Sequence, residues 1–157
     1  MITRLLADLL DAWLALAGGR ARLAAAWRFL PGDLMGMLVM VACGGLRVSR
    51  KVTLDGQEAL LVEDPRAARY LDHVPLRPYA QTLGRYVLAR EPLPEATLRH
   101  EVEHVRQWSR LGPFFLALYG LDSIRAVLTG GNHYRDNRFE QAARAMESGG
   151  PPPQPPG

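Results

Sequence analysis

The 157-residue chain has little of several features that usually direct an interpretation. Cys43 is its only cysteine, so no intramolecular disulfide can form and nothing indicates an oxidising compartment. Lys51 is the only lysine among 19 basic residues, and the arginines are dispersed rather than gathered in a run. A nucleic-acid interface would present a dense basic stripe with interleaved aromatic residues, so we expect no nucleic-acid partner.

Long apolar runs are also scarce. A membrane-spanning helix needs about 20 apolar residues, whereas the strongly apolar run over residues 34–43 is far shorter. The leucine-rich residues 1–17 are interrupted by Asp8 and Asp11, which does not fit the apolar region of a signal peptide. We therefore expect a soluble cytoplasmic protein, with peripheral membrane contact through the amphipathic residues 2–17 as an alternative.

Apolar residues recur at helical spacing in several stretches of the chain. The first two of these stretches end at helix-stop signals, Gly18-Gly19 and Pro31-Gly32. Residues 34–43, which Asp33 could cap, are either helix or buried strand, because periodicity does not decide for so short an apolar run. The predicted helices are residues 2–17, 21–29, 94–111, 114–128 and 137–146, with a short helical piece at 66–71.

Strand patterns are fewer. Residues 46–54 and 58–63 flank Asp55-Gly56, a strong hairpin turn, and residues 81–90 read as a third strand. This pattern predicts an α+β fold that is mostly helical, with a small three-stranded antiparallel sheet packed against the helix over 94–111. The expected organisation is a single domain over residues 1–147, made of a helical part (1–45) and a core (46–147), followed by a disordered proline-rich tail (148–157).

The helix over 94–111 carries the sequence His100-Glu101-x-x-His104. At about 100° per residue, two histidines four positions apart lie about 40° apart on one helix face, where both can bind one zinc ion. A nearby carboxylate can take a proton from a metal-activated water, but helical geometry alone does not choose between Glu101 and Glu103 for this role. The structural alternative is a pair of histidines and glutamates on a solvated helix face.

A catalytic zinc site needs a third protein ligand, which must come from outside this helix. Glu140 falls in the first turn of the last predicted helix, where it could face the histidines. It also stands three positions after Asn137, which is capping-box spacing, so the residues alone leave ligand and cap equally open. The other available donors are His73, His133, Asp122 and Asp136.

Residues 82–143 contain further elements at recognisable spacing: Thr82-Leu83-Gly84, His100-Glu101, His104, Gln107, Gly112-Pro113, Tyr134, Asn137, Phe139-Glu140 and Ala143. This pattern resembles a group of small bacterial proteins of the gluzincin type of zinc metallopeptidase. The resemblance implies a minimal zincin-like domain in which Glu140 completes the zinc site and Glu101 is the general base. One departure is Arg138, where the group usually has proline, and this weakens the helix start without removing a ligand.

The resemblance and the motif together predict a zinc-dependent metallopeptidase with a peptide or protein substrate. His100, His104 and Glu140 would hold the zinc ion, and Tyr134 or His133 would steady the oxyanion. Gln107, on the same helix face as His100, either buttresses the site or is a plain buried amide. The alternative function is a non-catalytic zinc-binding or interaction module; the oligomeric state is left open.

Overall fold

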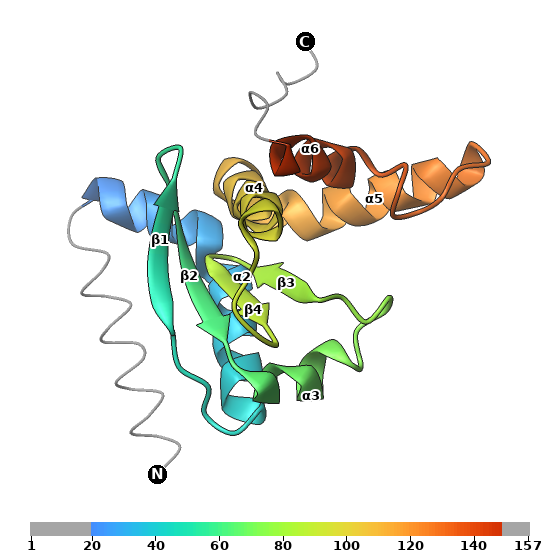
Figure 1. Cartoon of the computed structure of the whole chain (residues 1–157). Helices are drawn as coiled ribbons and strands as arrows, with labels where there is room; N and C mark the ends of the chain where they lie inside the picture. The colour runs from blue at the N-terminus through green and yellow to red at the C-terminus, as the bar shows by residue number, and fades with distance from the viewer. Residues whose placement is uncertain (1–19, 149–157) are drawn as a thin grey trace.

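The computed structural model describes residues 20–148, so the helix expected over 2–17 and all but the first residue of the tail expected over 148–157 lie outside it. The fold is mixed α+β, as expected, with helices around one sheet (Figure 1). The elements in chain order are α2 (Arg20–Ala42), β1 (Arg50–Leu54), β2 (Gln57–Glu63), η1 (Pro65–Ala67), α3 (Ala68–Leu71), β3 (Ala80–Leu83), β4 (Tyr86–Ala89), α4 (Glu95–Leu111), η2 (Gly112–Phe114), α5 (Phe115–Leu128) and α6 (Arg138–Glu147).

The sheet has four strands in the order β1-β2-β4-β3. The expected hairpin is confirmed: β1 and β2 pair antiparallel across a turn in which Asp55 and Gly56 have φ values of 49° and 76°. The expected three-stranded antiparallel sheet is wrong, because residues 81–90 form two strands and β4 pairs with β2 in parallel. Gly84, with a φ of 64°, reverses the chain between β3 and β4, in the middle of the residues predicted as one strand.

Alternate residues of the central strands pack into two cores on opposite faces of the sheet. Leu61 of β2 and Val87 of β4 are fully buried in the core that includes Val105 and Trp108 of α4. Their neighbours in sequence enter a second core with Met40 of α2. This period of two is what a sheet covered on both faces requires, and α2 accordingly passes behind the sheet in Figure 1.

α2 runs unbroken through Pro31, so the expected helix stop at Pro31-Gly32 and the expected cap at Asp33 are wrong. Asp33 is fully buried and accepts hydrogen bonds from the backbone N–H and the guanidinium of Arg85, at 2.6 to 2.8 Å. Gly32 packs directly on Gly84, so closely that a Cβ there would lie 2.4 Å from the Gly84 nitrogen. These contacts with the β3–β4 turn override the local cost of a proline within the helix, and residues 34–42 are helical, with Cys43 in the turn that follows.

α5 and α6 fold back over α4 and supply the remaining residues of the candidate site. An aromatic cluster joins the three helices: Phe115 of α5 packs against Trp108 of α4 and, edge to face, against Phe139 of α6, with ring centroids 5.0 and 5.6 Å apart. Tyr119 of α5 stacks on Phe139. Because Phe139 directly precedes Glu140, this packing fixes the start of α6 against α4.

Candidate metal centre

The two histidines of α4 lie side by side, as the predicted helix requires. His100 and His104 are both buried, with their Nε2 atoms 3.2 Å apart and their ring planes 77° apart. The alternative of a solvated helix face is therefore wrong, because both imidazoles point into a pocket beneath α5 and α6. Two nitrogen lone pairs directed at the same point are the start of a metal site.

Glu140 turns toward these histidines. One of its carboxylate oxygens lies 3.2 Å from Nε2 of His104, and the other lies 3.5 Å from Nε2 of His100. Asn137 caps α6 through its own side chain, which accepts a hydrogen bond from the N–H of Phe139 at 2.8 Å. Asn137 is therefore the residue that caps α6, and Glu140 is the third donor of the site.

The spacing of the three side chains suits a metal ion. One nitrogen of each histidine and one carboxylate oxygen of Glu140 all lie within 4.8 Å of one another, so three donors surround one point, as a metal site requires. Oε2 of Glu140 is buried and has no hydrogen-bond partner among the described residues, which is costly for a carboxylate oxygen unless a cation faces it. The buried group His100, His104 and Glu140 could therefore hold a metal ion.

Hydrogen bonds at the far side of each ring fix which nitrogen faces the site. Nδ1 of His104 lies 2.8 Å from Oε1 of Gln107, and the Gln107 amide donates to the carbonyl of Phe139 at 3.0 Å, which sets the orientation of that amide. Nδ1 of His100 lies 2.8 Å from a carboxylate oxygen of Glu147. Since an acceptor engages Nδ1 in both pairs, Nε2 is the nitrogen of each ring that is left to face a metal ion. Gln107 thus buttresses the site.

Charges around the site favour an ionised carboxylate. Burial alone would lower the pKa of His104, but the hydrogen bond to Glu140 and the charges of Glu101 and Glu140 outweigh it, raising the pKa from 6.5 to about 8. Burial raises the pKa of Glu140, yet its contacts with His100 and His104 lower it more. The pKa of Glu140 therefore lies far below its ordinary value of 4.5. Glu140 is therefore a carboxylate ready to bind a cation.

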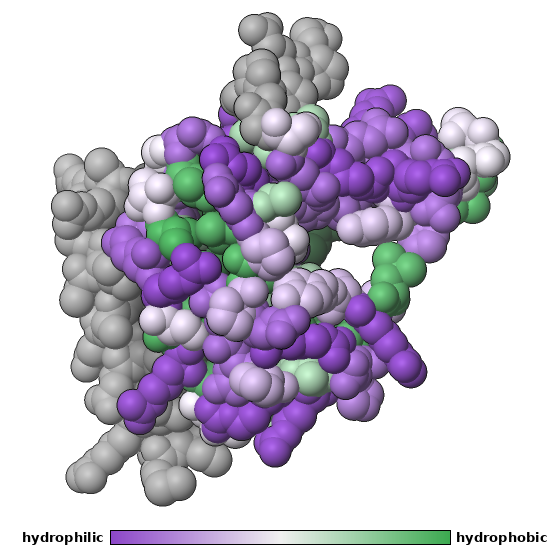
Figure 2. Space-filling view, in the orientation of Figure 1, coloured by the Kyte–Doolittle hydropathy of each residue, from purple (hydrophilic) through white to green (hydrophobic). Residues whose placement is uncertain are grey.

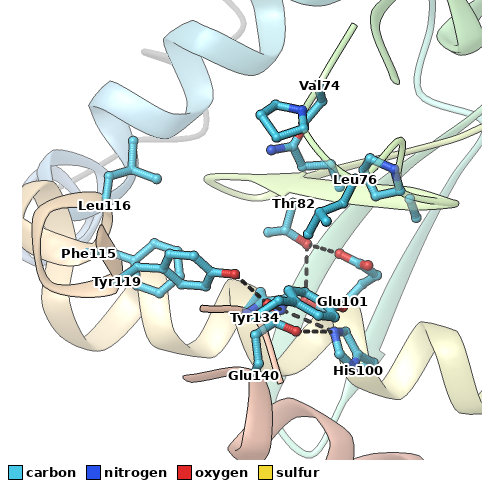
Figure 3. A pocket seen from close by; sticks show the side chains of 15 residues that line it. Val74, Leu76, Thr82, His100, Glu101, Phe115, Leu116, Tyr119, Tyr134 and Glu140 are labelled. Carbon is cyan, nitrogen blue, oxygen red and sulfur yellow. Dashed lines mark hydrogen bonds and ion pairs between the residues drawn. The ribbon is translucent and has the colours of Figure 1, made fainter. Parts of the chain in front are cut away.

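Two tyrosines face Glu140. The Tyr119 hydroxyl donates a hydrogen bond to Oε1 of Glu140 at 2.8 Å. Burial and the nearby Glu140 charge raise the pKa of both Tyr119 and Tyr134 well above 10, so both remain protonated hydrogen-bond donors. Tyr134 lies at the pocket as expected (Figure 3), whereas His133 is exposed and is not among the pocket residues. The structure therefore gives no support to the role expected of His133.

Glu101 lies in the same pocket but is not one of the three clustered donors. It is buried, and its Oε2 accepts a hydrogen bond from the hydroxyl of Thr82 on β3 at 2.7 Å (Figure 3). Glu103 is also buried but pairs with the guanidinium of Arg106 and does not line the pocket. The structure thus separates two glutamates that helical geometry left equivalent, and only Glu101 faces the pocket.

The pocket itself has a volume of about 360 Å³, within the range of sites that bind small ligands or side chains. Its floor is polar and its mouth is apolar: Val74 and Leu76 border it on one side, and Leu116 of α5 borders it on the other (Figure 3). β3, an edge strand of the sheet, runs along this pocket through Thr82.

The other donors considered from sequence lie elsewhere. His73 is exposed, with Nδ1 beside the carbonyl of Arg69, and Asp122 is paired with Arg125. Asp136 accepts a hydrogen bond from the N–H of Asn132. Sequence reasoning did not find the roles of Thr82, Tyr119 and Glu147, since each acts across a long-range contact; only Thr82 had a signal, its place in the family pattern.

Comparisons with protein families, with curated proteins and with solved structures find no significant match to this chain.

Proposed function

We propose that this protein is a zinc-dependent metallopeptidase of the gluzincin type. The observation that carries the proposal is the convergence of His100, His104 and Glu140, beside a separate buried carboxylate, Glu101, in one pocket. Two imidazoles and one carboxylate are a donor set typical of catalytic zinc, which keeps a fourth position for water or substrate. Bound zinc supplies a Lewis acid that polarises a carbonyl and lowers the pKa of a water.

Glu101 is the proposed general base. It is ionisable, faces the pocket, and has its orientation fixed by the hydroxyl of Thr82. Such a carboxylate can accept a proton from the attacking water and return it to the leaving amine. Holding the carboxylate in one rotamer before substrate arrives reduces the entropic cost of the step.

Tyr134 is the proposed donor to the oxyanion, because it lies at the pocket and stays protonated. β3 is the proposed docking edge for an extended peptide, which would add as a strand beside Thr82. The peptide class of the substrate follows from this edge strand and from the family resemblance.

Cleavage of a peptide library by the zinc-loaded protein tests the proposal. We expect Glu101→Gln to retain zinc and to lower the cleavage rate about 10²- to 10⁴-fold. Glu95→Gln, an exposed substitution on the same helix, is the matched control and should cleave as the parent does. A zinc-loaded parent that cleaves nothing, or a Glu101→Gln variant as active as the parent, would support a non-catalytic zinc-binding module instead.

A further inference from the structure

α5 turns hydrogen-bonding residues toward α6 and leaves most of its large apolar residues exposed, although Phe115 and Ala126 are buried. Asp122 and Ser123 make hydrogen bonds to α6, whereas Leu121, Ile124 and Leu128 are 62%, 57% and 81% exposed. At 100° per residue, positions 116 to 128 contain an arc of about 140° that holds no ionisable residue. We define the docking face as the large apolar residues of this arc, Leu116, Leu121, Ile124, Val127 and Leu128.

A second apolar element stands across the pocket from this helix. Leu76, in the loop between α3 and β3, is 61% exposed, and it lines the pocket opposite Leu116. Leu76 and Arg77 both have positive φ values, a backbone conformation that costs free energy for residues other than glycine. Figure 2 shows apolar surface at the tip of this loop and under the outer end of α5, on either side of a hollow.

We propose that the docking face and Leu76 bind the surface of a lipid bilayer. An arc of about 140° without an ionisable residue is the kind of apolar helix face that lies in the interface of a bilayer. Protein interfaces also mix apolar area with polar groups, and this arc has none that ionise. The run of helix Glu95–Leu128 contains an 18-residue window with a mean hydropathy of 1.4, of which only 17% is buried.

Length and charge specify how the helix would lie. α5 has 14 residues and is about 21 Å long, too short to cross about 30 Å of hydrocarbon, so it would lie in the plane of the interface. Arg77 follows Leu76, and Arg110 is one turn before the exposed Phe114. Neither guanidinium has a hydrogen bond or ion pair within residues 27–148, and both are exposed, so they are available to anionic headgroups.

This docking would place the mouth of the pocket at the membrane surface, because Leu76 and Leu116 both border it. The substrate would then be a peptide segment held at the membrane surface, such as the juxtamembrane part of an anchored protein. This consequence for the substrate rests on the proposed function, whereas the docking itself does not.

Flotation of the full chain with vesicles tests the docking. The probes are vesicles of phosphatidylcholine alone and of phosphatidylcholine mixed with anionic phosphatidylglycerol. We expect the parent to float with both, more strongly with the anionic vesicles, and the double variant Leu121→Gln/Ile124→Gln to bind at least about tenfold more weakly. Leu34→Gln/Leu38→Gln removes two similarly exposed leucines from α2 and should bind as the parent does.

Three results would overturn the proposal. The first is a parent protein that does not float with the vesicles. If the parent is then a dimer and the Leu121→Gln/Ile124→Gln variant is a monomer, a second copy of the chain covers the docking face. The second is unchanged binding by that variant, which would shift the contact to another segment such as residues 2–17. The third is an equal loss in Leu34→Gln/Leu38→Gln. His104→Ala should float as the parent does, so failure of the metal site is distinguishable from failure of docking.

Discussion

Nδ1 of His104 lies 2.8 Å from the amide oxygen of Gln107, three residues further along the same helix, and that amide is held in turn by the carbonyl of Phe139. One side chain therefore links a histidine of α4 to the residue that precedes Glu140 on α6. The position of the third donor and the direction of the imidazole are therefore set together.

Replacing Gln107 with leucine should weaken the metal site without unfolding the protein. The variant keeps the size of the side chain but removes the acceptor for Nδ1 of His104, so the ring is no longer held in the tautomer that frees Nε2. We expect zinc affinity to fall about 10- to 100-fold, measured by competition with a chelator. Gln141→Leu, at an exposed position of α6, is the control; equal affinity in both variants would remove Gln107 from the account.

Replacing Thr82 with valine should slow cleavage without releasing zinc. Valine has the same shape but cannot donate to Oε2 of Glu101. Loss of a hydrogen bond to a charged group is worth about 1.5–3 kcal/mol, so kcat/KM should fall at least about tenfold. Thr82→Ser keeps the hydroxyl and should restore most of the rate. A fall in zinc content that parallels the fall in rate would instead assign Thr82 a structural role.

Acid should weaken the anchor between α5 and α6. The hydrogen bond from Arg125 is the main cause that lowers the pKa of Asp122 from 3.8, and the N–H of Arg138 adds to it. A lowered pKa stabilises the fold above the unfolded value near 3.8, and this contribution is lost as pH falls below it through the folded pKa.

Asp122→Asn should therefore have a lower free energy of unfolding than the parent at neutral pH, by about 1 kcal/mol. The difference should shrink as the pH falls below 3.8. Urea unfolding at several pH values measures it, with Asp55→Asn at an exposed turn as the control. A difference that grows in acid would have the wrong sign and would contradict this assignment.

Gly84→Ala should destabilise the junction of α2 with the β3–β4 turn. Gly84 has a positive φ, and a Cβ there would lie 2.3 Å from the Asp33 carboxylate and 2.4 Å from its backbone nitrogen. The Gly84→Ala variant would therefore have conformational strain of about 1–3 kcal/mol and, in addition, a steric clash. Gly56 has a similar φ but open space around it, so Gly56→Ala should show the strain alone. Thermal unfolding that ranks the two variants the other way would contradict the close packing.

The sequence predicted the parts of the fold that depend on local spacing. The helix that carries His100 and His104, the Asp55-Gly56 hairpin and the start of α6 all follow from residues a few positions apart. The parallel pairing of β2 with β4 was missed, because residues 81–90 were predicted as one strand, whereas Gly84 turns the chain within them.

Contacts between distant residues account for the other errors and omissions. Asp33 looked like a helix cap, yet its partner is Arg85, 52 residues away. From the sequence alone, Glu140 could be either a metal ligand or part of a helix cap, because its distance to the histidines depends on how α6 packs on α4. The exposed apolar face of α5 was invisible for the same reason: periodicity identifies a helix but does not say which side is left uncovered.

The central claim is that two imidazoles and the carboxylate of residue 140 bind one divalent cation. The most direct measurement is the zinc content of the dialysed protein beside Glu140→Gln and His104→Ala, with Glu91→Gln as an exposed control. The account predicts one zinc ion per chain in the parent and the control, and loss of zinc in the other two. A parent that holds no zinc, or a Glu140→Gln variant that holds it as tightly, would contradict the account.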